Sequence, residues 1–270
     1  MNLREILAAS AIDKSELIIL LCHVLNISKE QLFTNDLEID ECDYSKINDL
    51  VKRRLAKEPV AYIVGKKQFY GYDFIVNNNV LVPRPETELI VDYVLDSTLH
   101  RDEFNLIDIG TGSGSIAVSI AKNRKKANIF ASDINLLSLN LAKKNIELNG
   151  VKNIHLFKQD LLQSVSTFYK FDFIVCNPPY ISNEEYKNLE KDLHYEPKIS
   201  LFAPSNGYFY LKQLIYEGKK HLKSKGKLIL EHGHNQKEEC VNFFQKKGYN
   251  NIECLLDLNN INRVTLGQNS

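Results

Sequence analysis

The sequence contains no CxxC pair, and its five cysteines lie far apart along the chain. An odd, scattered set without metal-ligand spacing indicates neither a zinc site nor a disulfide framework, so we expect no bound metal and a reducing compartment. Cys176 ends an apolar run, and we interpret it as a small buried hydrophobic residue.

The chain also lacks an excess of either charge and a long apolar run. Lys and Arg together number 34, as do Asp and Glu, so the formal net charge is zero. Proteins that grip a long nucleic-acid duplex usually carry a basic excess, so this balance argues against a direct nucleic-acid substrate. No run reaches the roughly 20 residues of a membrane span, and the first residues do not follow a signal-peptide pattern. We therefore expect a cytoplasmic protein with no membrane partner.

No glycine precedes Gly65, and the first part of the chain has the pattern of a helical bundle. Asp13 followed by Glu16, and Ser28 followed by Gln31, each resemble a helix capping box. Leucines and valines follow at helical spacing. We expect an N-terminal helical domain over residues 1–58.

In residues 59–83 the helical spacing gives way to alternating polar and apolar side chains. This pattern predicts a linking β-hairpin, with a turn at residues 77–79 and a second strand at residues 80–82. A helix should then begin at Pro85, because proline suits the first helical position. A helix start does not explain Arg84, which lies between two prolines.

From residue 105 onward, strand and helix patterns alternate. Strands are expected near residues 105–109, 127–132, 153–157, 171–176, 226–231, 251–256 and 263–267. Helices are expected near residues 115–123, 135–148, 208–221 and 235–247. The alternation predicts an α/β fold over residues 84–270, with a parallel sheet covered by helices on both faces. Only residues 258–261 separate the last two strands, which is too short for a parallel crossover, so these two should pair antiparallel.

A glycine-rich loop follows the first strand of this sheet. Alternating glycines let the backbone turn tightly and let a ligand approach it, and the following helix N-terminus attracts negative charge. Ser115 stands where a dinucleotide fingerprint has its third glycine, so a ligand without a pyrophosphate is favoured. The candidate cofactor-binding residues of the loop are Gly110, Thr111, Gly112, Ser113 and Gly114.

Acidic residues end the next two strands. Asp133 lies about 20 positions after the loop, where a carboxylate can accept hydrogen bonds from ribose hydroxyls. It can also cap the helix expected from Asn135, and both roles are compatible. Asp160, followed by Leu161, is a candidate to receive the exocyclic amine of an adenine, or a loop carboxylate.

The motif Asn177-Pro178-Pro179-Tyr180 follows the apolar strand at residues 171–176. Proline donates nothing to a sheet and excludes helix before it, so the motif predicts a rigid turn at the carboxyl end of a strand. Ligands bind at that edge of open α/β sheets. Taken alone, the motif is also compatible with a simple strand-ending turn.

The order of these features resembles the seven-stranded S-adenosylmethionine-dependent methyltransferases, in which the last strand is antiparallel. Among them, Asn-Pro-Pro-aromatic marks enzymes that methylate a planar nitrogen: adenine N6, guanine N2 or a glutamine amide. Asn177 Oδ1 and the Pro178 carbonyl can accept the two N–H hydrogens, and Tyr180 can pack over the amide. We take Asn177, Pro178 and Tyr180 as candidate catalytic residues.

Over nearly its whole length the sequence is similar to the release factor glutamine methyltransferases known as PrmC or HemK. The matching stretches are residues 58–65, 69–71, 82–88, 108–114, 177–180, 231–233 and 262–267. Residues 83–88 (PRPETE) best separate this family from nucleic-acid enzymes. The resemblance implies that the N-terminal domain recognises the substrate. It implies glutamine in the Gly-Gly-Gln motif of class 1 release factors as that substrate, and S-adenosylmethionine as cofactor, with S-adenosylhomocysteine as product.

The resemblance also implies which residues form the site. Cofactor contacts are expected at the glycine loop, Asp133, Asp160, Leu161 and Asn177, and substrate contacts at Arg84, Glu86, Asn177, Pro178, Pro179 and Tyr180. Leu161 stands where some relatives carry an aromatic residue beside the adenine, so stacking there would be lost. We assign no catalytic role to His232 or His234.

Two alternatives remain open at the level of sequence. One is a nucleic-acid amino-methyltransferase, because the motif at residues 177–180 alone does not exclude it. The other is a release-factor-binding adaptor that holds the cofactor without turnover, which the intact Asn177 and Tyr180 argue against.

Overall fold

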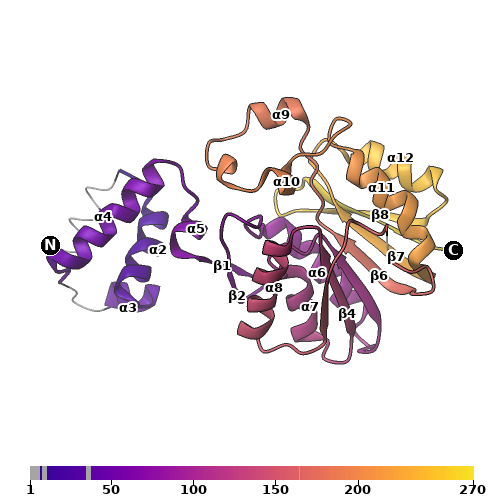
Figure 1. Cartoon of the computed structure of the whole chain (residues 1–270), viewed down its shortest axis with the longest axis horizontal. Coiled ribbons are helices and arrows are strands. Elements are labelled where there is room, and N and C mark those ends of the chain that lie inside the picture. The colour runs from indigo at the N-terminus through magenta and orange to yellow at the C-terminus, as the bar shows by residue number, and fades with distance from the viewer. Residues whose placement is uncertain (1–6, 8–10, 35–37, 164) are drawn as a thin grey trace. The chain divides into compact units, whose positions relative to one another are not determined.

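The computed structural model describes residues 7, 11–34, 38–163 and 165–270, and the chain divides by its internal contacts into two units (Figure 1). The first unit comprises residues 1–66 together with residues 190–195. The second comprises residues 67–189 and 196–270. The chain therefore passes between the units three times. The sequence had indicated boundaries near residues 58 and 83 and no return of the chain to the first unit.

The first unit is helical. Its helices are α2 (Lys14–Leu25), α3 (Lys29–Thr34), α4 (Glu41–Leu55), α5 (Val60–Val64) and, in the returning segment, the 3₁₀ turn η2 (Leu193–Tyr195). Its buried core consists of Leu17, Leu21, Leu32, Ile39 and Ile47. The Tyr195 hydroxyl donates to the Ala56 carbonyl at 2.9 Å, which ties the returning segment to the end of α4.

One of the two predicted capping boxes is confirmed. The Ser28 N–H donates to Gln31 Oε1 at 2.9 Å, and the Gln31 N–H donates to Ser28 Oγ at 3.2 Å. Asp13 also caps its helix, by accepting the Ser15 N–H at 2.8 Å. The box predicted with Glu16 is wrong, because that carboxylate instead accepts from Arg54 of α4 at 2.8 Å.

The hairpin lies earlier than predicted. Strands β1 (Lys66–Phe69) and β2 (Tyr72–Ile75) are joined by Tyr70 and Gly71, which have φ of 52° and 75°. Two central residues with positive φ are typical of a type I′ turn. The predicted turn at residues 77–79 is confirmed, because the Val80 N–H donates to the Asn77 carbonyl at 3.1 Å, but the predicted strand at residues 80–82 is wrong. The Val82 N–H donates to the Glu196 carboxylate at 3.0 Å and joins no sheet.

The second unit is built on a seven-stranded sheet. Its strands are β3 (Asn105–Ile109), β4 (Asn128–Asp133), β5 (Ile154–Lys158), β6 (Phe171–Cys176), β7 (Leu222–Glu231), β8 (Asn250–Leu256) and β9 (Asn262–Gln268). Their spatial order is β5-β4-β3-β6-β7-β9-β8, and β9 runs antiparallel to both of its neighbours. The predicted α/β fold with an antiparallel last strand is confirmed. Strand β7 begins four residues earlier than predicted.

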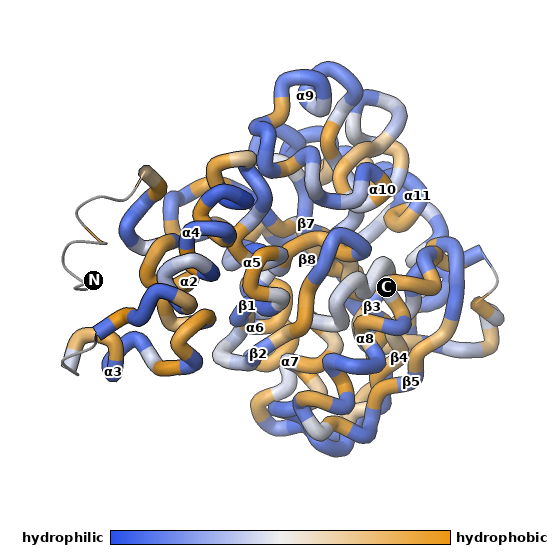
Figure 2. Tube along the Cα trace, turned by 60° about the vertical axis from the view of Figure 1, so that its left-hand side comes forward, coloured by the Kyte–Doolittle hydropathy of each residue, from blue (hydrophilic) through white to orange (hydrophobic). Residues whose placement is uncertain are grey.

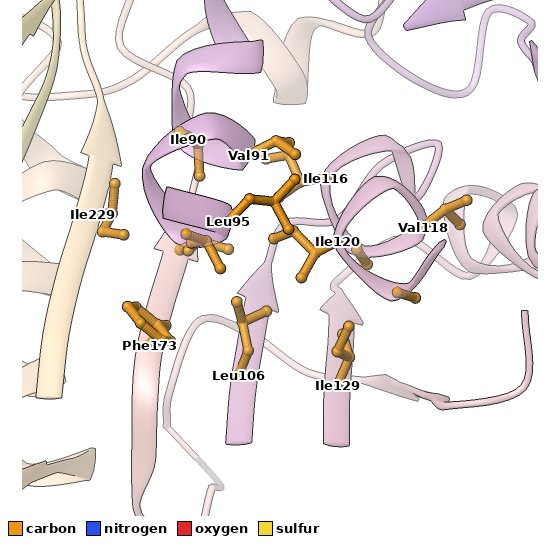
Figure 3. Close-up of a cluster of buried hydrophobic side chains, with 14 of the residues drawn as sticks. Ile90, Val91, Leu95, Leu106, Ile116, Val118, Ile120, Ile129, Phe173 and Ile229 are labelled. Carbon is orange, nitrogen blue, oxygen red and sulfur yellow. The ribbon is translucent and has the colours of Figure 1, made fainter. Parts of the chain in front are cut away.

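Helices cover both faces of this sheet. The 3₁₀ turn η1 (Pro85–Thr87) leads into α6 (Glu88–Ser97), so the predicted helix start at Pro85 is confirmed. Helices α6, α7 (Ser115–Asn123) and α8 (Leu136–Leu148) pack on one face, while α11 (Phe209–Gly218) and α12 (Lys237–Lys246) pack on the other. Side chains alternate between the two faces of the sheet along each strand. Leu106 therefore packs in the core beneath α6 and α7, and Ile107 packs in the core beneath α11 and α12. Figure 3 shows α6 and α7 lying over Leu106, Ile129 and Phe173.

The long connection between β6 and α11 carries α9 (Asn183–Lys187) and α10 (Lys198–Leu201), and the 3₁₀ turn η3 (Lys219–His221) leads into β7. Figure 2 shows that α9 is largely hydrophilic, whereas the strands of the sheet are mostly hydrophobic. No helix among the described residues has the length and apolar character that crossing a membrane requires.

Candidate active site

An open cleft lies at the carboxyl ends of β3, β4 and β6, where the glycine loop, Asp133 and Asn177 meet. It encloses about 1020 Å³, counting the space open to solvent. Its walls include four of the five predicted glycine-loop residues, 110–113, whereas Gly114 does not line it. The other lining residues include Leu81, Pro83, Arg84, Thr87, Ile134, Asp160, Leu161, Pro178, Pro179, Ile199, Ser200 and Tyr210. Sequence positions spread over 130 residues therefore form one site.

The glycine loop needs its glycines for backbone geometry. Gly110, Gly112 and Gly114 have φ of 68°, 55° and 82°, in the left-handed region that other residues rarely enter. A side chain at Gly114 would also meet the Cβ of Ala142 in α8 at 3.4 Å. Helix α7 begins immediately after the loop, and its N-cap residue, Gly114, has no side chain that could cap the first N–H groups.

Asp133 holds the loop in place as well as facing the cleft. Its Oδ2 accepts the Gly112 N–H and its Oδ1 accepts the Asn135 N–H, each at 2.9 Å. Each oxygen keeps a lone pair for a ligand hydroxyl. Asp133 is not the cap of α8, because Asn135 performs that role by accepting the Leu137 N–H at 2.9 Å. Burial raises the pKa of Asp133.

Leu161 lines the cleft in a strained conformation. Its φ of 47° lies in the left-handed region, which costs a non-glycine residue about 1 kcal/mol or more. Such conformations persist where the surrounding structure imposes them, and they gather at functional sites. Asp160 precedes it on the same wall.

The Asn177 amide is held by a chain of buried hydrogen bonds. Asn177 Nδ2 donates to Thr87 Oγ1 at 3.0 Å, and the Thr87 hydroxyl donates to Glu231 Oε2 at 2.5 Å. With Nδ2 engaged, Oδ1 is the free end of the amide and can accept from a ligand in the cleft. Thr87 and Glu231 carried no assigned role in the sequence, although both fall in stretches shared with the methyltransferase family.

Tyr180 lies behind the cleft wall. Its hydroxyl donates to Glu231 Oε1 at 3.2 Å, and its ring packs against the core beneath α11 and α12. Its carbonyl accepts from Gln236 Nε2 at 3.1 Å. Gly207 packs directly against that carbonyl, because a Cβ built at Gly207 would lie 2.2 Å from the oxygen. Tyr180 is thus fixed at both ends of the residue and does not line the cleft.

Of the two predicted substrate contacts Arg84 and Glu86, only Arg84 lines the cleft. The Arg84 guanidinium lines the cleft and forms an ion pair with the buried Glu196 carboxylate, which also accepts the Val82 N–H. Glu86 lies outside the cleft wall, and its charge acts on Glu231. No sequence signal marked Glu196 or Tyr210, because both follow segments without periodic pattern.

Two buried carboxyl groups flank the site. Burial raises the pKa of Asp108 to about 7, against the opposing hydrogen bond from the Thr111 hydroxyl at 2.6 Å. Burial likewise raises the pKa of Glu231 to about 7. Cys176 is buried beneath Gly110, and burial raises the pKa of its thiol, as expected of a hydrophobic core residue. His232 bonds the Gly233 carbonyl and the Thr265 hydroxyl, both at 2.8 Å, so both ring nitrogens have structural partners.

Comparison with known proteins places this geometry in a family. Residues 2–65 match the PrmC N-terminal domain, and residues 87–195 match the methyltransferase small domain. The chain is 36% identical to the release factor glutamine methyltransferase of Aliivibrio fischeri, over 93% of this chain and 88% of the relative. The chain belongs to the release factor glutamine methyltransferase family.

Other members of the family extend the match along the whole chain. The release factor glutamine methyltransferase of Thermodesulfovibrio yellowstonii is 34% identical, over 100% of this chain and 97% of the relative. A bifunctional methyltransferase of Rickettsia prowazekii is 38% identical over 91% of this chain, which spans 51% of that longer protein.

Solved structures with similar folds include a Pyrococcus furiosus methyltransferase, with a TM-score of 0.57, 20% identity and coverage of 82% of this chain and 98% of that chain. The human methyltransferase 10 domain containing protein gives a TM-score of 0.54, 20% identity and coverage of 74% and 90%. At this identity the likeness establishes the methyltransferase fold alone.

Proposed function

We propose that this protein transfers a methyl group from S-adenosylmethionine to the side-chain amide nitrogen of glutamine in the Gly-Gly-Gln motif of class 1 peptide chain release factors. The observation that supports this most strongly is the joint presence of a family match over the whole chain and an Asn177 that lines the cleft with its amide nitrogen already bonded to Thr87. Translation termination occurs in the cytoplasm, so the proposed substrate implies a cytoplasmic enzyme.

The cleft suits the proposed cofactor. Three left-handed glycines leave the loop backbone open to close approach, and Asp133 has free lone pairs for a ribose diol. Asp160 and the apolar side chains of Ile134 and Leu161 line the same cleft and suit an adenine. When bound, S-adenosylmethionine supplies an electrophilic methyl group on a sulfonium.

The chain's own part in the proposed reaction is to hold and orient an amide nitrogen. That nitrogen is a poor nucleophile, since its lone pair is delocalised into the carbonyl. Asn177 Oδ1 and the Pro178 carbonyl accept its two N–H hydrogens, which turns the lone pair toward the methyl group and favours the positive charge that develops on nitrogen. As the N–C bond forms, the S–C bond breaks, and the nitrogen then releases one proton to water. The two prolines keep both acceptors from moving.

The test uses labelled S-adenosylmethionine with a class 1 release factor and with the same factor carrying alanine in place of the Gly-Gly-Gln glutamine. We expect label in the first protein only. Equal labelling of both would remove the glutamine assignment, and labelling of RNA or DNA without the factor would favour a nucleic-acid amino-methyltransferase.

Asn177→Ala should abolish transfer and leave binding of S-adenosylhomocysteine partly intact, measured by calorimetry. Asn188→Ala is the matched control, because that exposed asparagine bonds only the Glu184 carbonyl. Turnover of Asn177→Ala near that of the control would contradict the proposed role of the amide.

A further inference from the structure

We propose that Glu231 is a positioning residue that fixes, through the Thr87 hydroxyl, which end of the Asn177 amide faces the cleft. The inference rests on the proposed function, because it concerns how the acceptor for the substrate amide is presented. Glu231 does not line the cleft, so it acts on the Asn177 amide through Thr87.

Of the three groups in this line of hydrogen bonds, Thr87 and Glu231 are buried, and Asn177 is half-buried at the cleft. Thr87 is 3% exposed and Glu231 is 2% exposed, so water does not compete for their hydrogen bonds. The bond of 2.5 Å between the Thr87 hydroxyl and the Glu231 carboxylate is short, as expected of a charge-assisted bond. Asn177 approaches Thr87 from the other side at 3.0 Å.

Counting hydrogens along this line determines the amide orientation. A threonine hydroxyl has one hydrogen and two lone pairs. An ionised carboxylate only accepts, so the Thr87 hydrogen is committed to Glu231. Thr87 then presents only a lone pair to Asn177, and a lone pair attracts the amide Nδ2 and repels Oδ1. The amide therefore turns Oδ1 toward the cleft, where an acceptor is needed.

The same carboxylate also holds the other end of the motif. Its second oxygen accepts the Tyr180 hydroxyl at 3.2 Å. One buried anion thus anchors both Asn177 and Tyr180, with the two prolines rigid between them. Residues 177 and 180 are reached from residue 231 only because β6 and β7 are neighbours in the sheet.

The ionisation of Glu231 is consequently linked to amide orientation. Burial and the charge of Glu86 raise the pKa of Glu231, whereas the hydrogen bonds from Thr87 and Tyr180 and the positive charge of Arg263 lower it, and the net result is a pKa of about 7. Below that pKa the protonated carboxyl can itself donate to Thr87. The hydroxyl hydrogen is then free to point at Asn177, and the amide is no longer held with Oδ1 toward the cleft.

Other charged and titratable groups lie near this line. Arg84 lies near enough to act on Tyr180, and the buried Cys176 thiol senses Glu231. Burial raises the pKa of Cys176 far above neutrality. Tyr180 itself has its pKa raised by burial, so it stays protonated. Glu231 is the member of the group that titrates near pH 7.

The first test replaces Thr87. Thr87→Val keeps the shape and removes the hydroxyl, so kcat should fall about 10- to 100-fold, while S-adenosylhomocysteine binding changes less than about threefold. Thr87→Ser restores the hydroxyl and should recover most of the activity. Thr98→Val is the control, because Thr98 is equally buried at the opposite end of α6, where its hydroxyl donates to the Val94 carbonyl and accepts from Arg124, away from the cleft.

The second test follows pH. In the wild type, kcat should decrease as the pH is lowered below about 7. In Glu231→Gln this acid limb of the pH profile should disappear, because residue 231 no longer titrates. The side-chain amide resonance of Asn177 in the free, ¹⁵N-labelled enzyme should show the same midpoint in the wild type and no titration in Glu231→Gln. This readout requires neither substrate nor cofactor.

The outcomes separate this inference from the proposed function. A wild type that labels no glutamine would refute the proposed function, whereas the amide titration would still report on Glu231. An active wild type whose acid limb and amide titration persist unchanged in Glu231→Gln would overturn the inference alone. So would a folded Thr87→Val enzyme with kcat within about twofold of the wild type.

Discussion

Gly207 is expected to control the position of Tyr180, so Gly207→Ala should damage catalysis from outside the cleft. Gly207 has φ of 87°, and a Cβ at this position would lie 2.2 Å from the Tyr180 carbonyl oxygen and 2.6 Å from Gln236 Nε2. The Gln236 amide is the donor that holds the same carbonyl. The new methyl group therefore strikes both partners of one hydrogen bond.

The expected loss of catalytic rate follows from the distance between the added Cβ and the Tyr180 carbonyl oxygen. Ordinary contact begins at 3.4 Å, so the Tyr180 carbonyl must retreat by about 1.2 Å. Because prolines stiffen residues 178 and 179, the displacement is passed along the motif toward Asn177. A misplacement of about 1 Å at a catalytic group reduces rate by roughly 100-fold, or about 2.7 kcal/mol on the barrier. The left-handed backbone adds about 1 kcal/mol of destabilisation.

Gly150→Ala provides the matched control. Gly150 has φ of 65° and nothing within 4 Å of the built Cβ, so it carries the backbone cost without the collision. We would measure kcat with a release factor substrate, S-adenosylhomocysteine binding by calorimetry, and unfolding in urea. A Gly207→Ala enzyme that loses stability as Gly150→Ala does, yet keeps wild-type kcat, would refute the coupling between Gly207 and the motif.

Three further predictions concern single charges. Asp133→Ala should weaken S-adenosylhomocysteine binding at least about tenfold in calorimetry, since charge-assisted bonds contribute about 1.5–3 kcal/mol each; unchanged affinity would exclude Asp133 as a contact. The native pKa of Asp108, about 7, exceeds the ordinary 3.8, so ionising it destabilises the fold as pH rises. Between about pH 5 and pH 8 the wild type should lose about 3 kcal/mol more than Asp108→Asn in urea unfolding, and parallel pH profiles would contradict this. Arg84→Met should destabilise the second unit by about 1–3 kcal/mol, and adding Glu196→Gln should recover part of the loss; additive effects would argue against the ion pair.

Much of the sheet could be predicted because its signals are local. Strands at residues 105–109 and 171–176 are mostly apolar and end just before a glycine loop and an Asn-Pro-Pro turn, and the structure has the same bounds. The hairpin was misplaced because three asparagines at residues 77–79 give a stronger turn signal than Tyr70 with Gly71. Tyr70 adopts a positive φ that its side chain disfavours, so no local rule indicates a turn there.

In the candidate site, too, local sequence pattern predicted some residues, whereas contacts between residues far apart in the chain could not be predicted. The sequence located Asp133 and Asn177 because each ends a strand, and strand ends gather at one edge of a parallel sheet. It gave no sign that Thr87 and Glu231, which lie 144 positions apart, share a hydrogen bond. That pairing depends on η1 meeting the end of β7, which only the packed structure determines. Local pattern likewise could not show that the Tyr180 hydroxyl turns toward a buried carboxylate.

The return of residues 190–195 to the helical unit has a consequence for how the chain can be divided. A fragment ending at Lys66 would lack the Tyr195 hydroxyl that closes the end of α4, and it would leave that surface uncovered. A protease cut near residue 66 would leave residues 1–66 held only by their contacts with residues 190–195, which stay covalently attached to the second unit. The helical unit is therefore completed by residues 190–195, which lie in the connection between β6 and α11. Autonomous folding should be sought only in fragments that carry both pieces, and gene fusions or truncations that treat residues 1–66 as a self-contained module would separate it from its own final turn.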